Sequence, residues 1–442
     1  MPAFQSAPIR NPLRGAVAVP GDKSISHRAL IFGALSVGET RISNLLEGDD
    51  VLRTAAAVRQ FGARVERGQN GVWTVQGCGV GGLHQPGNVL DLGNSGTGVR
   101  LLMGVAATLP FTTFFCGDES LSRRPMKRVF GPLEKFGASF LSRDGLLPCA
   151  VTGPATALPI QHRMTVASAQ VKSAILLAGL NAPGETTVIE KTATRDHTER
   201  MLRGFGAHIA SRETPEGTAI TLVGQPELTG QTVLVPADPS SASFFVVAAS
   251  LIPDSDVTLA GISLNPLRTG LFDVLREMGA SIEVTKQEEV GGEPIGDIRV
   301  RSARLSGVEI PPERAPSMID EYPILSVAAA AARGKTVMRG LEELRVKESD
   351  RVSSVAAGLR ACGVDVEETE DGMTVHGRDG EIPGGGRIQT HHDHRIAMAF
   401  AILGMAAQRP VVIDDDRMIA TSFPDFTPLA RGLGADITAW NG

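Results

Sequence analysis

Residues 52–63 read LRTAAAVRQFGA, an amphipathic helical pattern over 52–60 that ends in Phe61-Gly62-Ala63. The same ending, an apolar residue followed by glycine and a small residue, occurs six times, with its glycines 69 to 84 residues apart at positions 62, 137, 206, 279, 363 and 434. Glycine ends helices because it tolerates positive φ, and short alternating runs such as Ala207-His208-Ile209 then indicate strands. The sequence therefore predicts six repeats that tile the chain.

A second helix is expected in each repeat, upstream of a turn such as Gly38-Glu39-Thr40. Four of these helices are apolar nearly all round and cover residues 173–180, 242–251, 323–332 and 395–407. A helix without a polar face must be buried, whereas the amphipathic helix before each glycine can cover the outside. Each repeat is therefore expected to run strand, buried helix, strand, outer helix, strand, in an α/β fold.

The two halves of the chain also resemble each other. Val17, Val19, Pro20, Asp22 and Ser24 recur 216 residues later as Val233, Val235, Pro236, Asp238 and Ser240. This echo predicts two lobes of three repeats, one formed by residues 21–236 and the other by residues 1–20 plus 237–442, with the N-terminal strand crossing over.

Composition excludes several functional classes. The net charge is -6 and only 4% of the residues are aromatic, whereas nucleic-acid-binding proteins use a basic surface and aromatic rings that stack on bases. Nucleic-acid binding is therefore not expected. No apolar stretch approaches the roughly 20 residues of a membrane span, and the first 20 residues have no signal-peptide core. The four cysteines are too far apart for a zinc ribbon or disulfide framework, so a cytoplasmic location is expected.

Unusual polar residues gather at the expected starts of the six buried helices. A helix N-terminus has unsatisfied N–H groups that attract anions, so six such ends converging from two lobes predict an anion-binding cleft. Ser, Asp and Asn are also ordinary N-cap residues, and we interpret Asp238, Ser240 and Ser241 as caps. Lys23 and Arg28 are cations beside a buried helix start, which favours ligand binding over a structural ion pair.

Basic clusters extend this theme at residues 123–128, 195–197 and 345–351. If the last segment is helical, Lys347 and Arg351 face one direction and repel unless an anion lies between them. No phosphate loop, dinucleotide fingerprint or His-Glu-x-x-His motif occurs. The three histidines at 391, 392 and 394 cannot all point one way on a helix, which disfavours a metal site, and Cys116 is interpreted as packing rather than as a nucleophile.

Together these segments resemble the 5-enolpyruvylshikimate-3-phosphate (EPSP) synthase family, the 3-phosphoshikimate 1-carboxyvinyltransferases. The segments that carry the resemblance, in order, are 20–28, 92–97, 124–126, 168–173, 195–199, 320–321, 347–351 and 393–395. Segments 195–199 and 319–323 resemble the bacterial class II branch. The resemblance covers essentially the whole chain and implies a two-lobed inside-out α/β barrel of six βαβαββ repeats with buried helices and an active site in the cleft between the lobes.

The resemblance also implies an activity. The enolpyruvyl group of phosphoenolpyruvate is transferred to the 5-hydroxyl of shikimate 3-phosphate through a tetrahedral intermediate, phosphate is released, and neither metal nor organic cofactor takes part. This is a step of the shikimate pathway of aromatic amino acid biosynthesis. The substrates are small anions, so we expect a locally basic cleft in a globally acidic protein.

Roles for particular residues are carried over by motif. Those implied to bind shikimate 3-phosphate are Lys23, Ser24, Arg28, Ser168, Ala169, Gln170, Arg195, Asp320 and Lys347. Those implied to bind phosphoenolpyruvate are Lys23, Gly96, Arg124, Gln170, Arg351 and Arg395. The implied catalytic residues are Asp320, Glu348 and Lys23. Asp320 orients or deprotonates the 5-hydroxyl, and Glu348, with Lys23 and Lys347 nearby, supplies or relays the proton that the methylene carbon takes up.

Two departures from the family pattern matter for inhibition. The class I branch has a lysine before its C-terminal Phe-Pro, whereas Thr421 and Ser422 stand here. Some glyphosate-tolerant class II members have alanine at the position of Gly96, so we expect glyphosate to inhibit this chain more readily. Two alternatives remain: a UDP-N-acetylglucosamine enolpyruvyltransferase, which usually carries a loop cysteine, and a non-catalytic anion-binding protein of the same fold. A monomer is expected.

Overall fold

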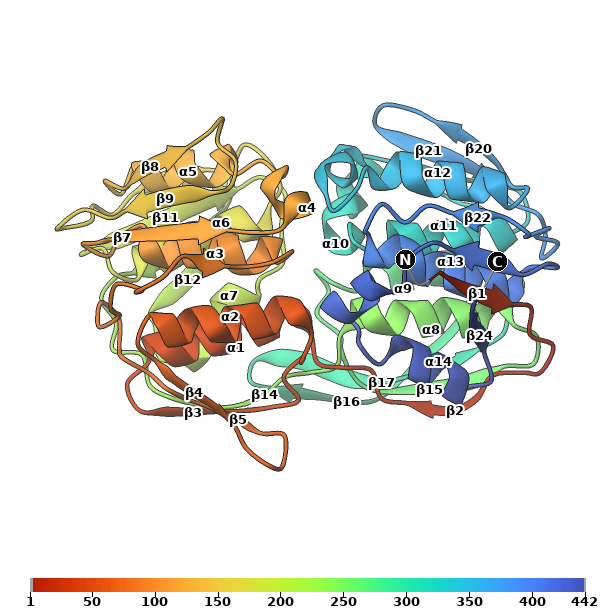
Figure 1. The fold of residues 1–442 in the computed structure, drawn as a ribbon, viewed down its shortest axis with the longest axis horizontal. Coiled ribbons are helices and arrows are strands. Elements are labelled where there is room, and N and C mark those ends of the chain that lie inside the picture. The colour runs from red at the N-terminus through yellow and green to blue at the C-terminus, as the bar shows by residue number, and fades with distance from the viewer. Residues whose placement is uncertain (1–2, 441–442) are drawn as a thin grey trace. The chain divides into compact units, whose positions relative to one another are not determined.

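The computed structural model describes residues 3–440, so the outermost residues of the expected lobe boundaries, 1–2 and 441–442, lie outside the described part. The chain forms two compact units. Unit 1 comprises Met1–Pro20, Pro236–Glu289 and Pro294–Gly442, and unit 2 comprises Gly21–Val235 with Val290–Glu293. Each unit has its own hydrophobic core and three four-stranded sheets (Figure 1).

The sheets of unit 2 share one strand order. The first is β14 (Thr232–Leu234), β3 (Glu39–Ser43), β5 (Trp73–Gln76) and β4 (Arg64–Arg67). The second is β6 (Leu90–Asp91), β7 (Thr112–Cys116), β9 (Cys149–Thr152) and β8 (Ser139–Ser142). The third is β10 (Gln161–Arg163), β11 (Glu185–Glu190), β13 (Gly217–Val223) and β12 (Ile209–Thr214).

Unit 1 repeats this order. Its first sheet is β2 (Arg14–Val17), β15 (Asp256–Ser263), β17 (Glu293–Arg301) and β16 (Ser281–Val290). The second is β18 (Glu309–Ile310), β19 (Lys335–Arg339), β21 (Gly372–His376) and β20 (Asp365–Glu368). The third is β22 (Arg387–Ile388), β23 (Val411–Ile413), β1 (Phe4–Ala7) and β24 (Asp436–Ala439), so the N-terminal strand completes the last sheet.

Each sheet joins one parallel pair to two antiparallel pairs, as β10 to β13 illustrate. β10 pairs with β11 in parallel, β11 with β13 antiparallel, and β13 with β12 antiparallel. In this sheet a helix lies in the crossover between the parallel strands, and β12 and β13 form a hairpin. In the sheet that contains the N-terminal strand, β1 instead pairs with β24 from the other end of the chain. The repeat is therefore βαβαββ, and the predicted fold class is confirmed.

Two strands pair in the unit opposite to the helix that follows them. β2 precedes a helix of unit 2 but pairs with β15 of unit 1, and β14 precedes a helix of unit 1 but pairs with β3 of unit 2. Apart from the short segment Val290–Glu293, which belongs to unit 2, the chain passes from one unit to the other at Pro20-Gly21 and again at Val235-Pro236. These are the two segments that echo each other in sequence.

The helices expected to be buried lie inside the units (Figure 1). They are α1 (Lys23–Leu35), α3 (Gly96–Ala106) and α6 (Ala169–Gly179) in unit 2, and α8 (Pro239–Leu251), α11 (Tyr322–Ala331) and α13 (His394–Ala406) in unit 1. Side chains cap five of them, since Asp22, Ser95, Ser168, Asp238 and Asp393 each accept a bond from a backbone N–H of the first turn. The capping interpretation is confirmed for Asp238 but is wrong for Ser240 and Ser241, which lie inside α8.

The outer helices are α2 (Asp49–Gln60), α5 (Lys127–Glu134), α7 (His197–Gly204), α9 (Gly270–Glu277), α12 (Arg351–Ala361) and α14 (Phe426–Gly432). All six glycines that follow them have positive φ, between 78° and 106°, as the repeat pattern requires. Short helices are α4 (Glu119–Ser122), α10 (Ala315–Met318), η1 (Pro312–Arg314), η2 (Glu342–Val346) and η3 (Arg417–Thr421). Between residues 3 and 440, no helix is long and apolar enough to cross a membrane.

Candidate active site

The implied substrate-binding residues of unit 2 lie at or just before helix starts. Lys23, Ser24 and Arg28 are on α1, Gly96 is the first residue of α3, and Ser168, Ala169 and Gln170 begin α6, while Arg124 lies between α4 and α5 and Arg195 precedes α7. In unit 1, Asp320 lies between α10 and α11, Lys347 and Glu348 follow η2, Arg351 begins α12, and Arg395 is in the first turn of α13.

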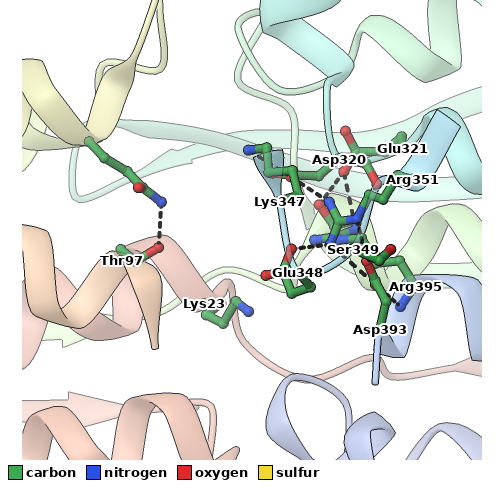
Figure 2. Close-up of polar contacts among 12 residues, drawn as sticks. Lys23, Thr97, Asp320, Glu321, Lys347, Glu348, Ser349, Arg351, Asp393 and Arg395 are labelled. Carbon is green, nitrogen blue, oxygen red and sulfur yellow. Dashed lines mark hydrogen bonds and ion pairs between the residues drawn. The ribbon is translucent and has the colours of Figure 1, made fainter. Parts of the chain in front are cut away.

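Arg351 is the centre of a buried charge cluster in unit 1 (Figure 2). Its guanidinium, 1% exposed, contacts three carboxylates: Nε lies 2.8 Å from Asp393 Oδ2, Nη2 lies 2.6 Å from Glu348 Oε2, and Nη1 lies 3.3 Å from Asp320 Oδ1. Burial alone would lower the pKa of Arg351, but the charges of Asp393, Glu348 and Asp320 raise it above its ordinary value. A forked guanidinium is the side chain that can bond three carboxylates at once.

Lys347 and Arg351 do not share a helix, because η2 ends at Val346 and α12 begins at Arg351. The two side chains were expected to face one direction only if residues 347–351 formed a helix, and they do not form one. An anion nevertheless lies by both cations, since Asp320 Oδ1 is 3.5 Å from Lys347 Nζ and 3.3 Å from Arg351 Nη1. One of the two implied catalytic carboxylates thus sits against two positive charges.

Arg395 is tied to the same turn through the backbone. Its Nη1 donates to the carbonyl oxygen of Asp320 at 3.1 Å. Asp393 caps α13 by accepting from the Arg395 N–H at 2.9 Å, and its other oxygen also accepts from Ser349 Oγ at 3.1 Å. The start of α13, the start of α12 and the Asp320 turn therefore form one polar network.

Lys23 and Arg28, on α1, have different surroundings. Lys23 Nζ forms an ion pair with Asp50 Oδ2 at 3.0 Å. Arg28 is buried and donates to neutral oxygens: Thr198 Oγ1 at 2.7 Å, Ser173 Oγ at 2.6 Å and the Ser24 carbonyl at 2.9 Å. Burial lowers the pKa of Arg28 to about 10, against the opposing charges of Glu199 and Asp22.

Helices α3 and α6 pack side by side, and their first turns bring Gly96 and Gln170 to the same guanidinium. Arg100 Nη1 donates to Gln170 Oε1 at 2.6 Å and to the Gly96 carbonyl at 3.3 Å. Gln170 Nε2 donates to Thr97 Oγ1 at 2.9 Å. Arg124 Nη2 donates to Asn94 Oδ1 at 2.5 Å. A Cβ at Gly96 would lie 3.0 Å from Nη1 of both Arg100 and Arg124.

Lys172 fixes the chain next to Arg195. Its fully buried ammonium lies 3.0 Å from Glu190 Oε1 and 2.7 Å from Glu199 Oε1, and it donates to the Thr194 carbonyl at 3.1 Å. Burial would lower the pKa of Lys172, but the charges of Glu199 and Glu190 raise it. The ammonium therefore stays charged and uses its three protons on three elements of unit 2.

Sequence reasoning assigned no site role to Arg100 and Lys172. Both are single cations inside otherwise apolar helices, in Val99-Arg100-Leu101 and Val171-Lys172-Ser173. Because an isolated buried charge is unstable, such a residue signals a partner or a ligand. That signal was available in the sequence, although the partners were not.

The histidine cluster and Cys116 were the other candidates for chemistry in the sequence. Within residues 3–440, no group of three or more His, Cys, Asp or Glu side chains is placed to hold a metal ion. The pKa of the Cys116 thiol is raised, first by burial and then by the charge of Asp91, so this cysteine lacks the lowered pKa of an activated nucleophile.

Comparison with solved structures first defines the class. The enolpyruvyl transferase NikO from Streptomyces tendae shares this fold with a TM-score of 0.77, at 20% identity and with 99% of each chain covered. An EPSP synthase from Acinetobacter baumannii matches with a TM-score of 0.86 at 44% identity, covering 99% of this chain and 100% of its own. The fold is that of the enolpyruvyl transferases.

The sequence then identifies the family. The family profile described as EPSP synthase (3-phosphoshikimate 1-carboxyvinyltransferase) matches residues 8–429. A 3-phosphoshikimate 1-carboxyvinyltransferase of Parvibaculum lavamentivorans is 63% identical over 425 residues, which cover 96% of this chain and 94% of that protein. The chain belongs to the EPSP synthase family, as its motifs predicted.

Proposed function

We propose that this protein transfers the enolpyruvyl group of phosphoenolpyruvate to the 5-hydroxyl of shikimate 3-phosphate and releases phosphate. Family membership supports this reaction, and one observation of the site carries it: Asp320 and Glu348 both bond the buried guanidinium of Arg351. Two carboxylates held close together by cations suit a reaction in which one proton is delivered and another removed.

The reaction proceeds in two steps. In the first, the 5-oxygen attacks C2 of phosphoenolpyruvate, the hydroxyl proton leaves, and C3 gains a proton to become a methyl group. The tetrahedral intermediate then loses phosphate as its C2–O bond breaks, while the methyl group gives up a proton and the double bond re-forms. Acid and base exchange roles between the steps, and the released phosphate takes up the balancing proton.

We assign the hydroxyl to Asp320 and the C3 proton to Glu348, with Lys23 as the third catalytic group. Lys347 and Arg351 hold Asp320 Oδ1 at 3.5 and 3.3 Å, which fixes the carboxylate that orients the hydroxyl. Glu348, whose Oε2 lies 2.6 Å from Arg351 Nη2, is fixed by the same cation. Their geometry is thereby set before substrate binds, which lowers the cost of reaching the transition state.

The remaining residues bind the two anions. For shikimate 3-phosphate we assign Lys23, Ser24, Arg28, Ser168, Ala169, Gln170, Arg195, Asp320 and Lys347, and for phosphoenolpyruvate Lys23, Gly96, Arg124, Gln170, Arg351 and Arg395. Arg28 donates to two neutral hydroxyls, those of Ser173 and Thr198, which hold its guanidinium in place.

We also propose that glyphosate inhibits the enzyme. We further propose that the enzyme is a monomer and works in the cytoplasm. Gly96 supports the first proposal, because a methyl group there would stand 3.0 Å from two guanidinium nitrogens, whereas glycine leaves that space open. Cys78, Cys116, Cys149 and Cys362 are all free thiols, which agrees with a reducing compartment.

Deuterium exchange tests the assigned proton transfer. The protein is incubated with phosphoenolpyruvate and shikimate 3-phosphate in D₂O, and the product and the recovered phosphoenolpyruvate are analysed by mass spectrometry. We expect deuterium in the methylene groups only when both substrates are present, and a loss of at least ~100-fold in its rate of incorporation for Glu348→Gln. Product formed without deuterium would contradict a protonated C3 intermediate.

A further inference from the structure

Glu321 joins the N-terminal ends of three buried helices of unit 1. It is 2% exposed and immediately precedes α11. Its Oε1 accepts a hydrogen bond from Ser240 Oγ of α8 and lies 3.8 Å from Arg395 Nη1 of α13. Figure 2 shows Glu321 next to Asp320 and beside the charge cluster. A single carboxylate oxygen therefore accepts a hydrogen bond from α8 and forms an ion pair with a guanidinium of α13.

A second arginine completes this contact. Arg268, 4% exposed, places Nη1 3.8 Å from Glu321 Oε1, and its Nη2 donates to Asp238 Oδ1 and to Ser240 Oγ, both at 3.0 Å. The two guanidinium groups of Arg268 and Arg395 thus face the two carboxylates of Glu321 and Asp238. A buried group of opposite charges is stable only while every member is present, because removing one member leaves an uncompensated charge.

Arg395 links Glu321 to the reacting groups. Its Nη1 bonds the Asp320 carbonyl at 3.1 Å while facing Glu321 Oε1 at 3.8 Å. Because Glu321 follows Asp320 directly in the chain, one guanidinium nitrogen touches two consecutive residues. Loss of the Glu321 charge removes one of these contacts and widens the range of orientations open to Arg395.

We propose that Glu321 is a positioning residue that sets the orientation of Arg395 toward phosphoenolpyruvate and the position of the Asp320 turn, without touching either substrate. This inference rests on the proposed function, in which Arg395 binds phosphoenolpyruvate and Asp320 orients the hydroxyl. A residue needed only for folding would change stability and leave the affinities for the two substrates in their original ratio.

The test is Glu321→Gln, which keeps the shape and an acceptor for Ser240 but removes the charge. We expect the KM for phosphoenolpyruvate to rise by about tenfold and kcat to fall by about tenfold, with the KM for shikimate 3-phosphate changed by less than about twofold. The control is Glu309→Gln, which removes an exposed carboxylate paired with Arg339 in the same unit and should leave all three constants unchanged.

A double-mutant cycle tests the route through Arg395. In an Arg395→Lys background, Glu321→Gln should add little further increase in the KM for phosphoenolpyruvate, because both changes disturb the same guanidinium. Fully additive effects would contradict the proposal. If Glu321→Gln does not fold, Glu321→Asp takes its place: a selective rise in the KM for phosphoenolpyruvate supports the role, and unchanged constants overturn it.

Different results would contradict the proposed function and the proposed role of Glu321. If the unaltered protein does not convert the two substrates, the proposed function is wrong. If it does convert them, and Glu321→Gln lowers only the melting temperature, then Glu321 is a structural residue and the further inference is wrong.

Discussion

Asp320 and Glu348 bond different nitrogens of one guanidinium: Asp320 Oδ1 lies 3.3 Å from Nη1 of Arg351, and Glu348 Oε2 lies 2.6 Å from its Nη2. The planar guanidinium holds the two carboxylates at a fixed spacing, because its nitrogens cannot move relative to each other. This fixed spacing supports the acid and base roles that we propose for the two carboxylates.

Arg351→Lys conserves the positive charge, but we expect it to lower both activity and stability strongly. An ammonium cannot reach Asp393, Glu348 and Asp320 at once, so at least one buried carboxylate loses its partner. We expect kcat/KM to fall by ~100-fold or more and the free energy of unfolding to fall by about 3 kcal/mol. Steady-state kinetics and urea denaturation measure both; wild-type values for either would contradict the arrangement.

Gly96→Ala should fold normally and change inhibition. The added Cβ would lie 3.0 Å from the terminal nitrogens of Arg100 and Arg124, which can move because they end flexible side chains. We expect the inhibition constant for glyphosate to rise by at least about tenfold, and the KM for phosphoenolpyruvate to rise less. Competition assays against phosphoenolpyruvate give both numbers, and equal changes in the two would argue against crowding of the inhibitor.

Lys172→Met should destabilise unit 2 more than it affects chemistry. Its fully buried ammonium is the partner of Glu190 and Glu199, so the variant leaves two buried carboxylates without it. We expect a loss of about 3–5 kcal/mol in the free energy of unfolding. The triple variant with Glu190→Gln and Glu199→Gln removes the charges as well and should recover part of that loss. No recovery would mean that packing, rather than charge, is responsible.

The repeats show how much of this fold is readable locally. The helix-ending glycines at 62, 137 and 206 have the positive φ that their pattern predicted, because that conformation depends on the residue itself. The burial of the apolar helices could also be predicted locally, because their composition leaves no polar face to turn toward water. The exchange of β2 and β14 between units was only suggested by the echo, because strand pairing depends on distant residues.

The hydrogen bonds and ion pairs among the proposed site residues could not be predicted from the sequence. Lys347 and Arg351 were expected to share an anion by helical spacing; they share Asp320, yet from separate elements. Arg268 received no assignment, because its partner Glu321 lies more than fifty residues away and nothing local marks the pair. Sequence motifs can point to candidate residues of one site, but the hydrogen bonds and ion pairs between those residues depend on the folded structure.

His27 should make stability depend on pH in acid. Burial, with the charges of Lys23 and Arg28, lowers its pKa to about 3, from about 6.5 in the unfolded chain. Between these two values the unfolded state binds a proton that the folded state does not, so this contribution to stability is complete above pH 6.5 and is lost as the pH falls toward 3.

His27→Gln removes that titration. Below pH 6.5 the free energy of unfolding of the unaltered protein should fall more steeply than that of the variant, with the difference approaching about 1.4 kcal/mol per pH unit. Urea denaturation at several pH values measures the two slopes. Parallel curves would mean that His27 is protonated in the fold.

The proposed reaction is tested most directly by phosphate release from phosphoenolpyruvate by the purified protein, with either shikimate 3-phosphate or UDP-N-acetylglucosamine as the acceptor, and with the product identified by mass. We expect phosphate release and an enolpyruvyl-bearing product with shikimate 3-phosphate alone. Release with UDP-N-acetylglucosamine instead, or with neither acceptor, would contradict it.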